Sequence, residues 1–283
     1  MKEYYLNLYT KTRDEYFDYL KSLLLREEKK FVITANTETF MLGIEDKEIN
    51  DMLINPNNSI IADGIGLVKG ARIKGLDIEE RITGVDVAKY LLEECSKNNK
   101  KVFIFGAKEE VLGKMKKVIT EEYNGIIIAG MINGYIDNKD EVFVKMIKET
   151  NPDVILVALG IPLQEKLINR HINEFKKGIF VGVGGSIDVL SGTIRRAPNI
   201  FIKTNTEWLY RIMTRPSRIK KFFKYNVKFG LKTVFSKRDR EVLWPLLAPS
   251  EGFILLLSRH FAENNPFYVV KPLKLDQFIL SNR

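Results

Sequence analysis

The 283-residue sequence contains one cysteine, Cys95, and two histidines, His171 and His260. A single thiol forms no intrachain disulfide and no cysteine-based zinc site, and two histidines argue against a histidine-rich metal site. No apolar run approaches the roughly 18 residues that a membrane-spanning helix needs, and the N-terminus lacks the apolar core of a signal peptide. We therefore expect a globular protein of a reducing compartment that is neither exported by a signal peptide nor threaded through a bilayer.

Acidic residues are scarce in one region only. The chain has a net charge of +9, and residues 203–240 hold twelve Lys or Arg against two acidic residues, a local charge of +10. The rest of the chain is therefore close to neutral. A neutral body with one cationic segment indicates local contact with a polyanion, which would be an anionic membrane surface, a nucleic acid or a phosphate-rich substrate.

Short apolar runs rich in β-branched residues alternate with stretches of helical periodicity. The runs, which predict buried strands, are residues 31–34, 59–62, 101–105, 125–129, 154–158 and 179–183. The predicted helices are residues 37–52, 85–98, 109–122, 139–150 and 163–175. This alternation predicts a Rossmann-like α/β fold, in which a mostly parallel sheet has helices on both faces.

The pattern changes after the sixth strand. We expect residues 1–198 to form the catalytic domain, residues 199–240 a basic helical appendage, and residues 241–283 a C-terminal extension whose role the sequence does not indicate. From Ile219 onward, apolar side chains follow helical spacing and lysines recur at every fourth position. Two interpretations stay open: a solvated helix that packs its apolar face on the body, or an interfacial helix that settles into anionic headgroups.

Polar residues follow the predicted strands, and ligands of such sheets bind outside the carboxyl ends of the strands. Asp63 comes directly after the second run, where a general base would lie, although it could also cap the next helix. Thr34 and Asn36 supply a hydroxyl and an amide at the neighbouring strand end, and turn chemistry explains Asn36 equally well. Gln164 follows the fifth run, at a predicted helix N-terminus that favours an anion.

Glycine-rich turns follow two of the strands. The segment from Asp63 to Gly70 resembles a dinucleotide fingerprint but is one residue too long, and Gly182-Val-Gly-Gly-Ser186 lacks the lysine of a P-loop. An ordinary strand-to-helix turn explains the second segment equally well. The sequence also lacks a Gly-x-Ser-x-Gly elbow and an Asp-x-Asp pair of the kind that holds a divalent ion on the diphosphate of a nucleotide sugar. If a diphosphate leaves in the reaction, backbone N–H groups and basic side chains would therefore have to neutralise it. The candidate arginines are Arg81, Arg195, Arg196, Arg211 and Arg218.

An ordered set of motifs resembles the WecG/TagA/CpsF glycosyltransferases from about residue 30 to about residue 235. In chain order the motifs are Thr34-Ala-Asn36-Thr-Glu38, Ala62-Asp63-Gly64, Arg81-Ile-Thr-Gly-Val-Asp86, Phe105-Gly106, Gly134-Tyr135, Gly160-Ile-Pro-Leu-Gln-Glu165, Gly182-Val-Gly-Gly-Ser-Ile-Asp188 with Gly192, Arg195-Arg-Ala-Pro198, Glu207-Trp-Leu-Tyr-Arg211 and Pro216-Ser-Arg218. Each motif is weak alone, and their order makes the resemblance specific.

The resemblance implies an inverting, metal-independent hexosyltransferase without a cofactor. It would move N-acetylmannosamine from its UDP donor (UDP-ManNAc) to undecaprenyl-diphosphate-linked N-acetylglucosamine, for a cell-surface polymer such as wall teichoic acid. The implied catalytic residues are Asp63, as the base, with Thr34 and Asn36. The implied substrate-binding residues are Arg81, Asp86, Gly106, Tyr135, Gln164, Gly184, Gly185 and Asp188. The residues implied to approach the diphosphate and the membrane are Arg211, Arg218 and Lys221, the last of which stands where the family has an arginine.

The implied partners are a UDP-sugar donor, a lipid-linked acceptor and an anionic membrane surface. The protein would be cytoplasmic and peripheral on the inner face of the bacterial plasma membrane, and it would self-associate as a homo-oligomer in solution. The donor stays open, because UDP-linked mannosaminuronic acid, glucose or galactose would suit the same fold in capsule or other polysaccharide synthesis. A non-catalytic nucleic-acid-binding module is disfavoured, since the cationic face alternates with bulky apolar residues, and no nucleic-acid partner is expected.

Overall fold

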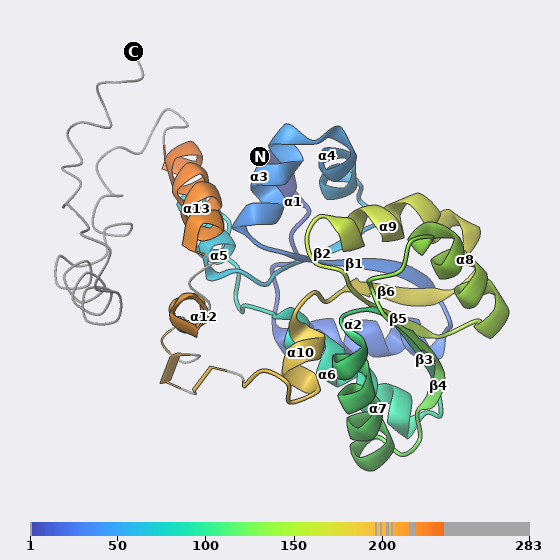
Figure 1. The fold of residues 1–283 in the computed structure, drawn as a ribbon. Helices are drawn as coiled ribbons and strands as arrows, with labels where there is room; N and C mark the ends of the chain where they lie inside the picture. Colours follow the sequence, from blue (N-terminus) through green and yellow to red (C-terminus); the bar gives the residue numbers. More distant parts are fainter. Residues whose placement is uncertain are drawn as a thin grey trace. The chain divides into compact units, whose positions relative to one another are not determined.

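The computed structural model describes residues 2–195, 197–198, 200–201, 204, 206–214 and 219–234. Within them, six strands pair in parallel in the order β2-β1-β6-β5-β3-β4 (Figure 1). The strands are β1 (Lys29–Ala35), β2 (Ser59–Ala62), β3 (Lys101–Gly106), β4 (Ile127–Ile132), β5 (Val154–Ala158) and β6 (Gly178–Gly182). The predicted α/β fold with a parallel sheet is confirmed.

Both faces of the sheet are buried, as parallel strands between two helical layers require. Phe31, Ile33 and Ala35 of β1 belong to one hydrophobic core, while Val32 belongs to the other. The strands β2, β3, β5 and β6 alternate in the same way. The near-continuous apolar runs that predicted these five strands therefore reflect burial on both sides, whereas β4, also predicted to be buried, lies at the edge of the sheet and is only partly buried.

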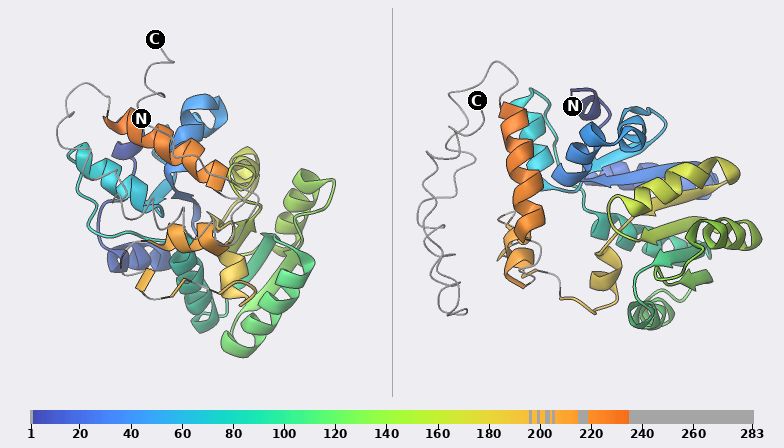
Figure 2. Two further views of the ribbon diagram at one scale, coloured as in Figure 1. Left: turned by 60° about the vertical axis from the view of Figure 1, so that its left-hand side comes forward. Right: turned by 45° about the horizontal axis from the view of Figure 1, so that its top comes forward.

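Helices form a layer on each face of the sheet (Figures 1 and 2). The helices that contribute to the first core are α1 (Lys2–Leu6), α3 (Thr37–Glu45), α4 (Lys47–Ile54), α5 (Ile65–Ile73), α8 (Lys139–Thr150) and α9 (Leu163–His171), which a 3₁₀ turn (Ile172–Glu174) follows. Those that contribute to the second core are α2 (Arg13–Leu25), α6 (Gly84–Lys97), α7 (Glu109–Glu122) and α10 (Ser186–Leu190).

The predicted elements differ from the structure in a few places. The helix predicted for residues 37–52 is two helices, because the carboxylate of Asp46 caps α4 by accepting from the N–H groups of Glu48 and Ile49 (3.0 and 3.4 Å). β4 begins two residues later than predicted, because Gly125 lies in a turn where an added Cβ would stand 1.9 Å from the Ser96 carbonyl oxygen. The predicted helix ranges also omit α1, α2, α5 and α10.

Two further helices, α12 (Glu207–Thr214) and α13 (Ile219–Val234), follow the sheet in sequence. α13 covers the residues for which a helix was predicted, and its Phe229 is 4% exposed in the first core, against the ring of Phe40. Both views of Figure 2 show α13 lying along α5. No helix among the described residues is long and apolar enough to cross a bilayer.

The chain divides into two units, residues 1–233 and residues 234–283, and the described residues of the first unit form one compact body. The helices α12 and α13 up to Thr233 belong to the first unit, with the sheet. The predicted extension, residues 241–283, lies outside the described residues, and the three-part domain division stays a prediction.

Gly106 offers a test of strand packing, because it ends β3 at φ +112° and a Cβ added there would stand 2.5 Å from the Ala158 carbonyl carbon and oxygen. We predict that Gly106→Ala lowers the free energy of unfolding by about 2–4 kcal/mol, since the methyl group must displace the neighbouring strand. Thermal unfolding measures the change. Gly113→Ala in α7, where nothing lies within 4 Å of an added Cβ, is the control and should not destabilise the protein. Equal losses for the two variants would contradict the packing argument.

Candidate active site

The carboxyl ends of β1 and β2 bring Asn36 and Asp63 together. Ala35 pairs with Ala62 in the parallel register, so the residues that follow are neighbours. The N–H groups of Asp63 and Gly64 both donate to the Ala35 carbonyl oxygen (2.9 and 3.3 Å), and a Cβ added to Gly64 would stand 3.0 Å from the Asn36 Cβ. Two of the predicted catalytic residues therefore share one edge, where Asp63 is half-buried. We call this the catalytic edge.

The structure distinguishes the capping roles considered for these two residues. α5 has Gly64 as its N-cap, so Asp63 lies one residue before the N-cap of that helix. Asn36 does cap α3: its Oδ1 accepts from the Thr39 N–H (3.1 Å), and Thr39 Oγ1 accepts from the Asn36 N–H (3.2 Å). This reciprocal pair fixes the direction of the Asn36 amide beside Asp63.

Thr34, the third predicted catalytic residue, is 6% exposed within the sheet. Its hydroxyl donates to the Gly182 carbonyl oxygen of β6 (2.7 Å). The hydroxyl hydrogen is therefore used to join two strands, and a contact with substrate would have to use the lone pairs of the oxygen.

Gln164 joins two of the strand-end loops. It is 2% exposed, and its Oε1 accepts from the N–H groups of Gly160 (3.1 Å) and Gly184 (2.9 Å). Its Nε2 donates to Glu165 Oε1 (2.8 Å). One buried amide thereby fixes the loops after β5 and β6 relative to each other.

The turn after β6 is the strand-to-helix connection considered in the sequence analysis. Gly184 has φ +46°, which favours glycine, and the exposed Gly185 is the N-cap of α10. Asp188 lies in α10 and is half-buried, with its Oδ2 3.8 Å from the position of a Cβ on Gly185. The structure therefore brings these three predicted substrate-binding residues together.

The predicted site extends along the whole edge of the sheet. Gly106 ends β3, and Tyr135 follows β4 with 75% of its surface exposed. Asp63 follows β2, which is the outermost strand on the other side of the sheet from β4. Five strand spacings of about 4.8 Å separate β2 from β4, so Asp63 and Tyr135 lie on the order of 24 Å apart. Such a strip suits an extended ligand and is too long for a small one.

Arg81 and Asp86, both predicted to bind substrate, contact protein groups. The Arg81 guanidinium lies 3.5 Å from the carboxylate of Glu207, with the two side chains 16% and 10% exposed, and so ties α12 to the segment before α6. At the start of α6, the Thr83 hydroxyl donates to the Asp86 carboxylate (2.6 Å). These contacts position both side chains before any substrate binds.

The predicted basic residues belong to the segment that contains α12 and α13. Arg218 lies outside the described residues, and at Arg211 in α12 and Lys221 in α13 the helix is described but the side chain is not. The ring of Trp208 in α12 stacks on Phe222 of α13, with centroids 4.6 Å apart and planes at 9°. The two helices that carry Arg211 and Lys221 therefore pack together.

α13 has one face packed on the body and an apolar stripe that is exposed. Phe229 and Thr233 are 4% and 2% exposed against the body. Phe223, Val227 and Leu231, which we call the exposed ridge, are 53%, 51% and 50% exposed. An exposed lysine follows each of the three in sequence. The helix therefore packs one face on the body, as the first interpretation predicts, and keeps a lysine-flanked apolar ridge exposed; the interfacial interpretation stays a prediction.

The glycine run after Asp63 is a packing motif. A Cβ added to Gly66 would stand 2.5 Å from the Thr37 Cγ2, and one added to Gly70 would stand 2.5 Å from the Tyr5 hydroxyl and 2.9 Å from the Phe229 ring. The glycines therefore let α5 approach α1, α3 and α13 closely.

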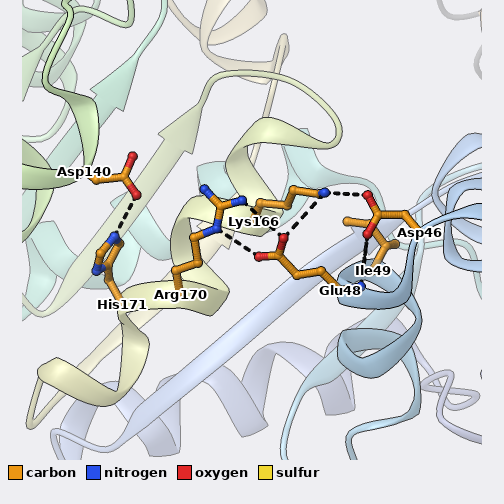
Figure 3. Close-up of polar contacts among 7 residues, drawn as sticks. All are labelled: Asp46, Glu48, Ile49, Asp140, Lys166, Arg170 and His171. Atoms are coloured by element: carbon orange, nitrogen blue, oxygen red, sulfur yellow. Dashed lines mark hydrogen bonds and ion pairs between the residues drawn. The ribbon is translucent and has the colours of Figure 1, made fainter.

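An ion-pair network holds α9 against α4 (Figure 3). Lys166 pairs with Asp46 and with Glu48 (3.4 Å), and Arg170 donates to both carboxylate oxygens of Glu48 (3.1 and 3.2 Å). The hydrogen bond from Lys166 lowers the pKa of Asp46 below its usual range. Because α9 begins with the turn that contains Gln164, the network supports one end of the site from outside.

His171 ends α9 between two carboxylates. Its Nε2 lies 2.8 Å from Asp140 of α8, and its Nδ1 lies 2.7 Å from Glu174, which also pairs with Lys148 (2.6 Å). Burial opposes protonation of the imidazole, but the hydrogen bonds to the two carboxylates outweigh it and raise the pKa of His171 above 6.5. Among the described residues, no three His, Cys, Asp or Glu side chains gather as a metal-binding group.

Residues 5–242 match a family described as the glycosyl transferase WecG/TagA/CpsF family. A relative from Bacillus subtilis is 36% identical over 231 residues, which are 81% of this chain and 89% of the relative. One from Bacillus spizizenii is 34% identical over 204 residues (72% and 79%), and one from Staphylococcus aureus is 39% identical over 193 residues (67% and 74%). All three relatives have the name N-acetylglucosaminyldiphosphoundecaprenol N-acetyl-beta-D-mannosaminyltransferase.

The raised pKa of His171 predicts a pH-dependent stability. Protonated His171 stabilises the fold fully below about pH 6.5, and this contribution is lost as the pH rises through the pKa of the folded protein. The loss of melting temperature in His171→Gln should therefore be larger at about pH 6 than at about pH 9. Thermal unfolding at both pH values measures it, with Asp140→Asn as a second variant that should reduce the same dependence. A constant difference between wild type and His171→Gln would show that the imidazole does not titrate in this way.

Proposed function

Because the chain belongs to the WecG/TagA/CpsF glycosyltransferase family, we propose that it transfers N-acetylmannosamine from UDP-ManNAc to undecaprenyl-diphosphate-linked N-acetylglucosamine. The product would serve a cell-surface polymer of the wall teichoic acid type. The observation that carries this proposal is the catalytic edge, where Asn36 and Asp63 meet at one end of a strip suited to a nucleotide sugar.

Asp63 is the general base in this mechanism. Its carboxylate takes the proton from the acceptor hydroxyl as that oxygen attacks the anomeric carbon, and UDP leaves from the opposite face, so one displacement inverts the configuration. The reciprocal hydrogen bonds between Asn36 and Thr39 orient the Asn36 amide beside the Asp63 carboxylate. There the N–H groups of the Asn36 amide donate to an oxygen of the bound sugar. Thr34 supports the same edge through its bond to β6.

The donor lies along the strip with its base at the β3–β4 end. Tyr135 presents an exposed ring on which a pyrimidine stacks, and Gly106 lies in the same region. The diphosphate passes the loops that Gln164 joins, where Gly184 and Gly185 leave the backbone open. Asp188 accepts from the base or the ribose, and Asp86 lies in the first turn of α6 with its carboxylate held by a hydrogen bond.

The leaving diphosphate is neutralised by basic side chains in place of a metal ion. The candidates are Arg211 and Arg218, whose planar forks suit phosphate oxygens, and Lys221, which acts as a point charge. Their segment carries a charge of +10 in an otherwise near-neutral chain. Arg81, through Glu207, fixes the helix that contains Arg211.

The exposed ridge of α13 fits an anionic membrane surface. Three apolar side chains with adjacent lysines bury their apolar atoms at the headgroup boundary and leave the ammonium groups among lipid phosphates. This supports a cytoplasmic protein held peripherally on the inner face of the membrane, where the diphosphate of the lipid acceptor would be within reach.

The proposed base is tested with Asp63→Asn, which keeps the size of the side chain and removes its basicity. Release of UDP from UDP-ManNAc with a short-chain lipid-diphosphate N-acetylglucosamine, without added metal, should fall at least about a hundredfold. Calorimetry should find donor affinity close to that of wild type. Asp14→Asn, on a carboxylate 90% exposed in α2, is the matched control and should keep full activity.

The outcomes of that assay separate the activity from the assignment. Equal release by wild type and Asp63→Asn would keep the transferase and remove Asp63 from its role. No release by wild type with UDP-ManNAc, but release with another UDP-sugar, would correct the donor. No release across the panel would reject the proposed function.

The membrane surface is tested with the double variant Phe223→Ser/Leu231→Ser, which removes most of the exposed ridge and keeps every lysine. Its affinity for vesicles that contain phosphatidylglycerol should fall at least about tenfold, because the two apolar side chains that would be buried in the membrane are lost. Co-sedimentation measures binding. Leu25→Ser, which changes a leucine 49% exposed on α2, should bind as wild type does. Unchanged binding by the double variant would remove the ridge from membrane contact.

A further inference from the structure

α13 makes one polar contact with the body close to the catalytic edge. The Thr37 hydroxyl donates to Asn226 Oδ1 (2.8 Å), and Asn226 Nδ2 donates to the Phe222 carbonyl oxygen one turn earlier in α13 (2.9 Å). Thr37 is 6% exposed and Asn226 is half-buried. The contact is therefore largely withdrawn from water, and each partner is held by its own helix.

Thr37 is the first residue of α3 and directly follows Asn36. The turn that contains Asp63 and Gly64 packs directly on Asn36, with a Cβ on Gly64 lying 3.2 Å from the Asn36 Cα and 3.8 Å from the Thr37 nitrogen. A displacement of Thr37 therefore moves Asn36 relative to Asp63. The hydrogen bond to Asn226 connects α13 to the residues that form the catalytic edge.

The helix α5 packs closely against α13 next to this hydrogen bond. A Cβ added to Gly66 would stand 3.8 Å from Asn226 Oδ1, and one added to Gly70 would stand 2.9 Å from the Phe229 ring. Lys228 of α13 also pairs with Glu45 at the far end of α3. Apolar packing thus sets how close α13 lies, and the bond from Thr37 sets its register along α3.

We propose that Asn226 is a positioning residue that, through Thr37, sets the distance between the acceptor-binding cations and the catalytic base. This inference rests on the proposed function, in which α12 and α13 present basic side chains to the acceptor diphosphate and Asp63 deprotonates the acceptor hydroxyl. The two groups act on one lipid-linked molecule, so their spacing has to match its length. The bond from Thr37 to Asn226 fixes that spacing without touching the substrate.

The proposal predicts an effect on the acceptor and little effect on the donor. In the proposed function the donor nucleotide binds along β3, β5 and β6, and Gln164 joins the loops after β5 and β6 without α13. Loss of the bond should therefore lower kcat/KM for the lipid acceptor and leave KM for UDP-ManNAc within about twofold. One hydrogen bond between neutral groups corresponds to roughly a fivefold to tenfold change.

The experiment compares Thr37→Val, Asn226→Leu and their combination in the full-length protein with vesicle-bound acceptor. Each single variant should lower acceptor kcat/KM about fivefold to tenfold, and the double variant should lose no more than either, because both remove the same bond. Thr37→Ser, which keeps the hydroxyl, should retain the wild-type kcat/KM for the acceptor. Thr120→Val is the matched control, since the Thr120 hydroxyl bonds only within α7, to the Lys116 carbonyl oxygen.

The proposal is overturned if folded Thr37→Val and Asn226→Leu proteins keep wild-type acceptor kinetics, if the single effects add, or if donor KM rises as much as acceptor KM. Amide hydrogen exchange tests the coupling independently of activity. In Asn226→Leu, exchange should rise both in α13 and in the first turn of α3, and it should be unchanged in Thr120→Val. A rise confined to α13 would overturn the coupling even if the proposed reaction itself proved wrong.

Discussion

The parallel pairing of β1 with β2 is the constraint on which the site depends. Both faces of β1 are buried, so a slip of one residue would exchange its two sets of core side chains, and the register is therefore fixed by the core. That register places Ala35 opposite Ala62 and lets one carbonyl oxygen accept from both Asp63 and Gly64. The meeting of Asn36 and Asp63 is thus a consequence of packing well below the site.

Small residues let the surrounding helices follow this edge closely. Gly64 admits the backbone of Asn36, while Gly66 and Gly70 bring α5 onto α3 and α13. A side chain at any of the three would separate elements that the proposed chemistry needs together. The buried amide of Gln164 has the corresponding role at the next part of the strip, where two backbone N–H groups share one acceptor.

The fold was predictable because a strand buried on both faces needs a continuous run of apolar residues, and such a run is visible in a short stretch of sequence. Helical periodicity likewise predicted α13. Strand ends also predicted where Asp63, Asn36 and Gln164 would lie. Contacts between distant segments had no such signal: Thr37 and Asn226 are 189 residues apart, and Arg81 and Glu207 are 126 apart. The break at Asp46 was missed because its capping bonds interrupt an otherwise continuous helical pattern.

The charge distribution explains why the link between α13 and the catalytic edge is a bond between neutral groups. In the proposed function, the segment of residues 203–240, with its charge of +10, presents these charges to phosphates and to anionic lipid, and such anions would compete with surface ion pairs. The pair between Lys228 and Glu45 is exposed to that competition, since its side chains are 44% and 38% exposed. The bond from Thr37 to Asn226 involves no charge and is largely shielded from water, so it can hold its geometry when the lysines around it exchange their partners for lipid. A position set in this way is independent of the electrostatic contacts that we propose bring the helix to the membrane.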